Sequence, residues 1–414
     1  MFGRTHAVLA MFAISLALCV VPALAQGGDV GSGAVTAVEP GISVLLHDRM
    51  DLIRGKNVGL ISNPTGVDRQ LVSDVDLLER APGVHLVALF GPEHGFRGAH
   101  QAGSGVGAEH DPETGLPVYS LYGTNRGPTP DMLKNVDVLV FDIQPVGTRF
   151  YTFLYTMTDA MKAAARAHIP FIVLDRPDPI DAIHVQGPVL EPGYASFVGK
   201  YPIALRYGMT VGELAGLFND RFGIHADLTV VRMRGYKRSM YYDDTGLPWV
   251  MPSPNVPTLD TALVYPGMGL FEGTNVSEGR GTTRPFELIG APWIDAEKLA
   301  RAMDAEHLPG VRFRPAYFTP TFSKYQGQSC GGIEIYVFDR NTFDPVVDAL
   351  ALIKAIHDAY PTQFKFDPGD FDRLAGNSWV REDIEDGVSI TAMQKQWQKR
   401  LDAFKRERKQ YLLY

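Results

Sequence analysis

The densest group of chemically capable side chains in the sequence is Glu93-His94-Gly95-Phe96-Arg97. Its carboxyl, imidazole and guanidinium groups can donate a proton, relay a proton and bind an anion, respectively. The segment follows an apolar run directly, so we expect Glu93 where a buried strand reaches the edge of a sheet. Partial desolvation there favours the protonated carboxyl that a general acid must carry at neutral pH, although the charge of Arg97 opposes this.

A second group of polar side chains lies between residues 272 and 287. Four of them suit the binding of sugars or the transfer of protons, namely Glu272, Asn275, Glu278 and Arg280. The segment is too charged for a core strand and too rich in hydrogen-bonding groups for an idle linker. The sequence therefore predicts that this segment forms part of a binding site.

A stiff segment precedes this second group. Prolines recur between Pro252 and Pro257, and each proline ring fixes the backbone angle φ. This stiffness can hold Trp249 and Asn255 in place. An aromatic ring that covers the face of a sugar, together with planar polar groups that bind its hydroxyls, is typical of a carbohydrate site.

Polar side chains also follow four apolar runs, at the points where these runs end. Asn63, Glu93, Asp142 and Asp175 follow the first, second, third and fourth run. In open parallel sheets ligands bind beyond the carboxyl ends of the strands, so we expect these side chains to converge. Any single one of them also fits a turn or a helix cap, but four in succession favour a site.

Other kinds of site are less well supported. Three further side chains near His94 raise the question of a metal, namely His100, His110 and Asp111. Their spacing matches no metal-ligand pattern, and no metal is expected. Residues 327–331 fit the G-x-S-x-G pattern of serine hydrolases, but a strand rather than a helix is expected after Ser329. Residues 103–108 resemble a dinucleotide fingerprint without the required strand before and helix after it.

The alternation of apolar runs with helical patterns predicts an α/β fold. Strands are expected at residues 57–62, 84–90, 136–142, 170–175 and 228–233. Several of these runs are almost continuously apolar, which is typical of strands buried on both faces of a parallel sheet. Residues 150–168 carry apolar side chains at helical spacing, and Thr210 with Glu213 forms a capping box. This order predicts a Rossmann-like, doubly wound, mostly parallel sheet.

Changes in composition divide the chain into five parts. We expect a signal peptide at 1–25, a flexible leader at 26–39, a Rossmann-like catalytic domain at 40–235, a Gly/Pro/Asn-rich active-site loop region at 236–290 and a smaller C-terminal α/β domain at 291–414. In the smaller domain we expect helices at 295–305, 344–359 and 390–410 and strands at 311–318 and 332–339. A loop region of this length within a compact domain is usually functional.

The N-terminus has the features of an export signal. An apolar run from Ala7 to Val21 precedes Ala23-Leu24-Ala25, which fits the small-x-small rule for cleavage. The run is shorter than the ~20 residues that a membrane helix needs. Leu18 before Cys19 does not suit a lipoprotein signal. We therefore expect cleavage after Ala25, a periplasmic or extracellular protein, and no stable membrane insertion.

Composition argues against several other classes of protein. The 414 residues, 45% of them hydrophobic, suffice for a large core. The formal net charge is −8, and the basic run at 405–409 is mixed in sign, so nucleic acid is not an expected partner. Cleavage would leave Cys330 as the single cysteine, which excludes an internal disulfide and a Cys₄ zinc site. The sequence leaves the oligomeric state open.

Several motifs, taken in order, resemble one enzyme family. They are residues 59–66, 91–98, 142–144 with 147–151, 252–255, 272–275 and 277–283. The chain resembles the NamZ-type exo-β-N-acetylmuramidases over residues 42–414. It departs from the family pattern at Pro145, where we expect Asp, and this removes position 145 from the candidate catalytic groups.

The resemblance implies a Rossmann-like domain and a smaller C-terminal domain with the site in the cleft between them. It also implies hydrolysis of terminal β-linked N-acetylmuramic acid without a cofactor. The substrates would be peptidoglycan-derived MurNAc-GlcNAc saccharides or muropeptides. Glycoside hydrolysis needs an acid at the leaving oxygen and a nucleophile, a base or the substrate's own acetamido group. Glu93 is the candidate acid, and Glu278 or Asp142 is the candidate second group.

The remaining candidates bind substrate. The lactyl carboxylate of muramic acid requires a cation, for which arginine is well suited. The candidate cations are Arg97, Arg149 and Arg280, and the other candidate binding residues are Asn63, His94, Tyr151, Asn255, Glu272 and Asn275. Arg149 and Tyr151 also fit a role as helix caps. The sequence does not separate retaining, inverting and substrate-assisted mechanisms.

Two other functions fit the same residues. One is a non-catalytic periplasmic protein that binds muropeptides or sugars, and it predicts saturable affinity without turnover. The other is a periplasmic esterase or amidase of the cell wall, and it predicts that activity depends on Ser329.

Overall fold

The computed structural model describes residues 1, 3, 37–101 and 109–414. Contacts divide the chain into residues 1–36 and residues 37–414, and the fold described below is that of the second unit. Apart from residues 1 and 3, the predicted signal peptide lies outside the described residues. Most of the predicted leader at 26–39 and the glycine-rich segment at 103–108 also lie outside them.

The apolar runs form a seven-stranded sheet in the order β3-β4-β2-β1-β5-β6-β9. Its strands are β1 (Asn57–Ser62), β2 (His85–Gly91), β3 (Glu109–His110), β4 (Pro117–Ser120), β5 (Val138–Asp142), β6 (Phe171–Leu174) and β9 (Leu228–Val231). All neighbours pair in parallel except the edge strand β3, which is antiparallel to β4. The six parallel strands follow the Rossmann order 3-2-1-4-5-6. The predicted fold class and the five predicted strands are therefore confirmed, with small shifts at the strand ends.

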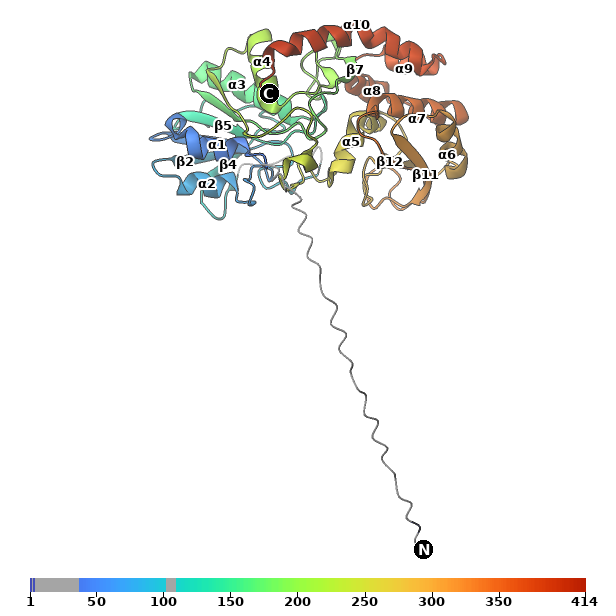
Figure 1. Ribbon diagram of the computed structural model, residues 1–414, viewed down its shortest axis with the longest axis horizontal. Coiled ribbons are helices and arrows are strands. Elements are labelled where there is room, and N and C mark those ends of the chain that lie inside the picture. Colours follow the sequence, from blue (N-terminus) through green and yellow to red (C-terminus); the bar gives the residue numbers. More distant parts are fainter. Residues whose placement is uncertain (2, 4–36, 102–108) are drawn as a thin grey trace, which may run out of the picture. The chain divides into compact units, whose positions relative to one another are not determined.

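Helices cover both faces of this sheet (Figure 1). Alternate residues of β5 face opposite cores, because side chains alternate along a strand. Val138 and Val140 pack with α1 (Gly41–Asp48) and α2 (Asp74–Arg80). Leu139 and Phe141 pack with α3 (Phe153–Ala167) and α4 (Val211–Arg221). The predicted capping box at the start of α4 is present, with Thr210 and Glu213 each bonding the other's backbone.

The C-terminal part is built around a three-stranded antiparallel sheet in the order β10-β12-β11. Its strands are β10 (Leu288–Ala291), β11 (Val311–Phe318) and β12 (Cys330–Val337). The helices of this part are α6 (Ala296–Ala305), α7 (Pro345–Ala359), α8 (Pro368–Ala375), α9 (Trp379–Glu385) and α10 (Ile390–Arg408). α6 packs on the sheet and against α7. The helices and strands predicted here from the sequence are confirmed.

Two features join this part to the Rossmann-like sheet. A small antiparallel ribbon of β7 (Gln186–Val189) and β8 (Ala204–Arg206) contacts α10. α10 itself runs back across the molecule toward α4, near which the chain ends (Figure 1). No helix in the described part of the chain has the length and apolar character needed to cross a membrane.

The region 236–290, expected as loop, also contains regular structure. α5 (Leu259–Met268) lies within it, followed by the 3₁₀ helix η4 (Gly269–Gly273). Thr258 caps α5 by accepting a hydrogen bond from the Thr261 backbone. Most of α5 is buried, and it packs against α7. Because α5 is buried on most sides, it has no polar face, and its sequence shows no helical alternation of polar and apolar residues.

Candidate active site

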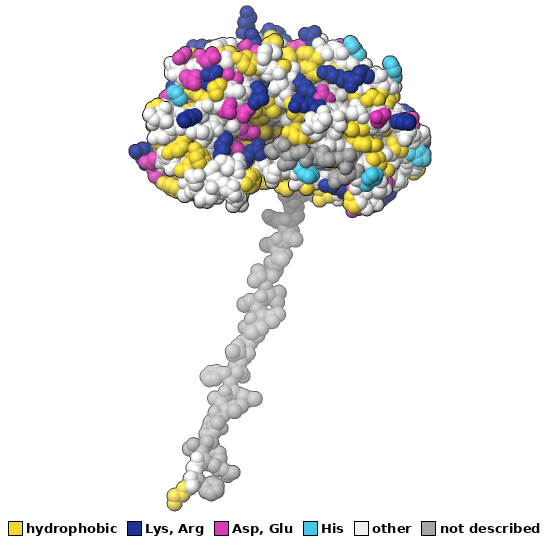
Figure 2. All heavy atoms as spheres, turned by 180° about the vertical axis from the view of Figure 1, so that it is seen from behind, with side chains coloured by type: hydrophobic (Ala, Val, Ile, Leu, Met, Phe, Trp, Pro, Cys, Tyr) yellow, Lys and Arg dark blue, Asp and Glu magenta, His cyan; other side chains and the backbone are white. Residues whose placement is uncertain are grey.

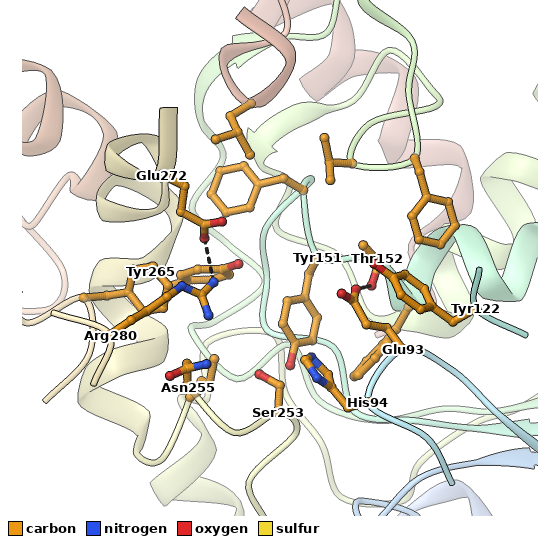
Figure 3. A pocket seen from close by; sticks show the side chains of 17 residues that line it. Glu93, His94, Tyr122, Tyr151, Thr152, Ser253, Asn255, Tyr265, Glu272 and Arg280 are labelled. Atoms are coloured by element: carbon orange, nitrogen blue, oxygen red, sulfur yellow. Dashed lines mark hydrogen bonds and ion pairs between the residues drawn. The ribbon is translucent and has the colours of Figure 1, made fainter. Parts of the chain in front are cut away.

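One pocket gathers side chains from both parts of the fold (Figure 3). It is lined by Glu93, His94, Tyr122, Phe150, Tyr151, Thr152, Phe153, Phe197, Val198, Ser253, Asn255, Val256, Tyr265, Glu272, Arg280, Phe286 and Leu374. The first seven follow the carboxyl ends of β2, β4 and β5, as expected for a parallel sheet. The cavity volume is about 140 Å³. A cavity of about 150 Å³ holds a benzene ring, so this pocket has room for one six-membered ring.

Glu93 lies on one wall and is held by two hydroxyl groups. Thr152, which immediately precedes α3, donates a hydrogen bond of 2.7 Å to Glu93 Oε2. Tyr122, two residues after β4, also hydrogen-bonds to Glu93. Burial and the adjacent carboxylate raise the pKa of Tyr122 to about 12, so its hydroxyl stays protonated and can donate. These contacts fix the orientation of the carboxyl toward the cavity (Figure 3).

His94 has a strained backbone, with φ at 73°. Left-handed backbone at a residue other than glycine is costly and often occurs at functional sites. The loop folds back so tightly that a side chain at Gly91 would collide with the backbone of Phe96. His94 Nδ1 lies 2.7 Å from the carbonyl oxygen of His100 and must donate to it. Burial lowers the pKa of His94, so the neutral ring leaves Nε2 as a hydrogen-bond acceptor.

The opposite wall carries an ion pair between Glu272 and Arg280, with Oε1 and Nη2 3.0 Å apart. The Glu272 side chain lies deep in the cleft, but 32% of it is exposed, and it faces the cavity (Figure 3). Burial raises the pKa of Glu272, and Arg280 opposes this rise. Arg280 also pairs with Glu278 at 3.2 Å, and Glu278 accepts a 3.0 Å hydrogen bond from Lys324. The charges behind this wall are therefore mutually neutralised.

Aromatic rings form the surface between these walls. The Tyr265 ring meets those of Phe286, Phe150 and Tyr151 edge-on, with centroids 4.5, 5.2 and 6.0 Å away. The Tyr151 hydroxyl points toward Ser253 and His94 (Figure 3). Burial raises the pKa of Tyr151, so it remains a neutral phenol. Aromatic surface with convergent polar groups is suited to a sugar.

Six of the residues predicted from the sequence line this pocket: Glu93, His94, Tyr151, Asn255, Glu272 and Arg280. Six others are absent from its described lining: Asn63, Arg97, Asp142, Arg149, Asn275 and Glu278. Each of these six has protein partners instead. Sequence reasoning also missed Tyr122, Thr152 and Ser253. Tyr122 follows a strand of four residues, too short for an alternating pattern to show, whereas Thr152 and Ser253 lie within or beside recognised motifs.

Asp142 ends β5 and Asn63 follows the neighbouring β1, at the point where the sheet order reverses. Asp142 is fully buried and forms an ion pair with Arg176, whose Nη2 lies 2.9 Å from Oδ2. Burial raises the pKa of Asp142, and Arg176 opposes this rise. Asn63 donates to the carbonyl of Pro252 at 3.3 Å and accepts a hydrogen bond from the Thr65 backbone. The proline-rich segment thus covers this end of the sheet, and the pocket lies beside it.

The other predicted binding residues have structural partners. Arg149 is buried and donates only to backbone carbonyls. Arg97 is half exposed and pairs with Asp111, which is buried. Asn275 donates to the Gln363 carbonyl and accepts from the Lys365 backbone, each at 2.8 Å. Arg280 is therefore the one candidate cation that reaches the described pocket.

The described pocket has neither a metal site nor the serine of the G-x-S-x-G pattern. Among the described residues, no group of three or more His, Cys, Asp and Glu could hold a metal ion. Ser329 is exposed and is followed directly by β12, the strand expected there. It is absent from the described lining of the pocket. On the face shown in Figure 2, acidic and basic side chains are interspersed.

Comparisons with known proteins agree with this geometry. The family model for the N-terminal part of exo-β-N-acetylmuramidase NamZ matches residues 58–260, and that for its C-terminal part matches residues 263–414. Peptidoglycan β-N-acetylmuramidase NamZ of Bacillus subtilis (strain 168) is 57% identical over 378 residues, which span 91% of each chain. The chain is therefore similar to this relative over nearly its whole length.

Two solved structures of DUF1343 family proteins from Bacteroides fragilis NCTC 9343 have the same fold. The first has a TM-score of 0.85 and 40% identity, and the second has a TM-score of 0.74 and 32% identity. Each match covers 91% of this chain and 99% of the other. With both family models matched in order along one chain, this protein belongs to the NamZ family of exo-β-N-acetylmuramidases.

Proposed function

We propose that this chain is an exo-acting glycosidase that releases terminal β-linked N-acetylmuramic acid from peptidoglycan fragments during cell-wall turnover. Membership of the NamZ family supports this function. The observation that carries it is the placement of Glu93 opposite the Glu272–Arg280 ion pair, across a pocket with room for one sugar ring. A single-ring pocket suits an enzyme that removes one terminal sugar at a time.

In the proposed mechanism Glu93 protonates the glycosidic oxygen as the bond to the leaving sugar breaks. The positive charge that then develops on the sugar ring requires a negative partner. Glu272 takes this part, either facing the anomeric carbon or orienting the acetamido group that attacks it. Water then forms the new bond to the anomeric carbon, and a carboxylate takes its proton: Glu272 if water attacks directly, or the deprotonated Glu93 if the acetamido group attacked first. Arg280 holds Glu272 in position. Asp142 and Glu278 act behind the site, through the ion pairs that shape it.

The binding roles follow from the same contacts. His94 Nε2 and Tyr151 provide an acceptor and a donor for sugar hydroxyls. The Tyr265 and Phe286 rings cover the apolar face of the sugar. The substrates are MurNAc-GlcNAc saccharides or muropeptides, which end in the sugar that the pocket would accept.

The test uses a chromogenic β-N-acetylmuramide and the matching β-N-acetylglucosaminide. We expect rapid release of the chromophore from the muramide and far slower release from the glucosaminide. Saturable binding of the muramide without release would favour a binding protein. An esterase or amidase would release no chromophore from either glycoside; it would instead cleave an ester or amide of a wall fragment, and that activity would be lost in Ser329→Ala.

We also propose that the chain is exported and cleaved after Ala25, on the basis of the apolar run and the Ala23-Leu24-Ala25 site. Mass spectrometry of the exported protein should then give a mature N-terminus at Gln26. A lipid-modified Cys19 would contradict this proposal.

A further inference from the structure

The sugar pocket continues into a second hollow of about 530 Å³. The two spaces share four lining residues, namely Phe197, Val198, Glu272 and Leu374. The second hollow carries two arginines of its own, Arg126 and Arg373. A substituent on a sugar held in the first pocket therefore has room to extend past Phe197 toward positive charge.

The arginines around the two spaces differ in whether a carboxylate neutralises them. Arg280 pairs with Glu272 and Glu278. Arg373 pairs with Asp370, which lines the same hollow. No carboxylate of the described residues forms an ion pair with Arg126, so Arg126 is the one of these three arginines whose charge remains uncompensated.

Arg126 is exposed, and one aromatic contact orients it. Its guanidinium carbon lies 4.4 Å from the centroid of the Phe197 ring, in a cation–π contact. Lys200 lies 5.4 Å from the same ring, but its ammonium group pairs with Asp159. The Phe197 ring in turn lies 5.9 Å from that of Tyr122. Arg126 therefore stands on the same side of the pocket as Glu93, to which Tyr122 hydrogen-bonds.

We propose that Arg126 binds the lactyl carboxylate of N-acetylmuramic acid and thereby selects this sugar over N-acetylglucosamine. This inference rests on the proposed function. The two sugars differ by the lactyl ether, which carries a methyl group and a carboxylate. The Phe197 ring offers apolar surface to the methyl group, and the guanidinium fork of Arg126 matches the geometry of the carboxylate. Arg126 is a specificity residue and takes no part in proton transfer.

The test is the Arg126→Gln variant, compared with the wild type on the muramide, on its lactyl methyl ester and on the glucosaminide. We expect kcat/KM on the muramide to fall by about 10- to 100-fold, as for loss of a hydrogen bond to a charged group. Activity on the neutral ester and on the glucosaminide should stay unchanged. Arg126→Lys should keep part of the selectivity, because it keeps the charge but loses the fork.

Arg373→Gln is the matched control, because it removes a cation from the same hollow that Asp370 already neutralises. It should leave the ratio of muramide to glucosaminide activity unchanged. The proposal is overturned if Arg126→Gln keeps the wild-type ratio, or if Arg373→Gln lowers it instead. Calorimetric binding of free N-acetylmuramic acid and N-acetylglucosamine gives the same comparison without turnover. Failure of hydrolysis in the wild type and failure of the Arg126 assignment are thus separate results.

Discussion

At the scale of single residues, the proposed reaction depends most on Glu93. Thr152 and Tyr122 orient its carboxyl, and the cavity lies in front of it. We predict that Glu93→Gln folds normally and still binds N-acetylmuramic acid, because the amide keeps the shape of the side chain. Its kcat should fall by at least ~10²-fold, the low end for loss of general acid catalysis.

The leaving group separates an acid from a binding residue. A dinitrophenyl glycoside departs with little protonation, so Glu93→Gln should recover part of its lost rate on that substrate. Glu272→Gln should recover nothing, because stabilisation of the charged ring is needed for every leaving group. Near-normal turnover of the natural disaccharide by Glu93→Gln would transfer the acid role to Glu272, the other carboxyl of the described pocket.

Half of the site residues predicted from the sequence line the pocket, and there is a physical reason why the other half do not. Motif and strand position identify where a polar side chain leaves the backbone, as for Glu93 after β2. They do not identify its partner, which can lie far away along the chain. Arg149 pairs with carbonyls more than 220 residues away at Leu374 and Ala375, and Asp142 pairs with Arg176. A charged residue that binds substrate and one that stabilises the fold therefore look the same in a sequence motif.

At the scale of elements, the parallel strands were predictable because burial on both faces gives continuous apolar runs, as in β5 and β6. The ribbon of β7 and β8 was not, because strands of three or four residues are too short for a pattern. The second wall of the pocket likewise depends on tertiary contacts. The 3₁₀ helix η4 carries Glu272, and Lys324 from the segment before β12 holds it.

Lys324 gives a test at this scale. Its ammonium group donates to the carbonyls of Phe271, Glu272 and Val276 and to the Glu278 carboxylate. We predict that Lys324→Met lowers the free energy of unfolding by about 3 kcal/mol, because it leaves a buried carboxylate short of a partner. It should also lower kcat, because Arg280 is placed by Glu278 and Glu272.

The control for Lys324→Met is Lys298→Met. The Lys298 side chain is 74% exposed and pairs only with Asp295 on the surface of α6. It should cost less than about 1 kcal/mol and leave kcat unchanged. Chemical denaturation and steady-state kinetics on both variants supply the comparison. Equal effects of the two substitutions would show that the Lys324 ammonium group does not organise this wall.

α7 contains a carboxyl group whose burial should make stability depend on pH. Asp348 is fully buried, and neither carboxyl oxygen has a hydrogen-bond partner among the described residues. Burial, with a smaller effect from Asp344, raises the pKa of Asp348 to about 8. The folded state therefore holds this proton more tightly than the unfolded state, in which the pKa is near 3.8. The resulting loss of stability begins above pH 4 and is complete above pH 8.

We predict that Asp348→Asn removes this dependence, because the amide is neutral throughout. Its gain in free energy of unfolding over the wild type should grow by roughly 1 kcal/mol per pH unit between pH 4 and 8. Asp358→Asn, on the exposed side of the same helix beside Lys354, should give no such gain. Urea denaturation at several pH values measures both. A gain that does not vary with pH would mean that Asp348 does not titrate in this range.

At the scale of the whole molecule, the site requires the Rossmann-like sheet and the C-terminal part to be held together. Glu93 comes from the first and Arg280 from the segment leading into the second. Arg149, which lies between β5 and α3, links the ribbon of β7 and β8 to the end of α8. Its Nη1 donates to Pro188 and Ile203 at 2.8 and 3.2 Å, and its Nη2 donates to Leu374 and Ala375 at 2.8 Å. The C-terminal Tyr414 adds a second link through its 2.8 Å hydrogen bond to Asp175.

The Arg149 guanidinium lies so close to the backbone of Gly376 that no side chain fits there. A Cβ atom at Gly376 would meet the guanidinium at 2.7 Å, so this close approach requires glycine. Burial lowers the pKa of Arg149 to about 10, which still leaves it charged at neutral pH. Its charge is therefore stabilised mainly by the dipoles of the backbone carbonyls that it binds.

We predict that Arg149→Met lowers the free energy of unfolding by at least about 3 kcal/mol, because unsatisfied buried carbonyls cost about 1–3 kcal/mol each. Three tryptophans, Trp293, Trp379 and Trp397, report on the C-terminal part. In the variant, their fluorescence should change at lower urea concentration than the circular dichroism of the whole chain. Activity should fall as well, because Leu374 lines the sugar pocket.

Arg400→Met is the control. Arg400 pairs with Glu191, and its side chain is 56% exposed; such pairs contribute about 0–1 kcal/mol. If both variants unfold alike in a single transition, Arg149 is not what couples the two parts, and the coupling rests on α10 and Tyr414 instead.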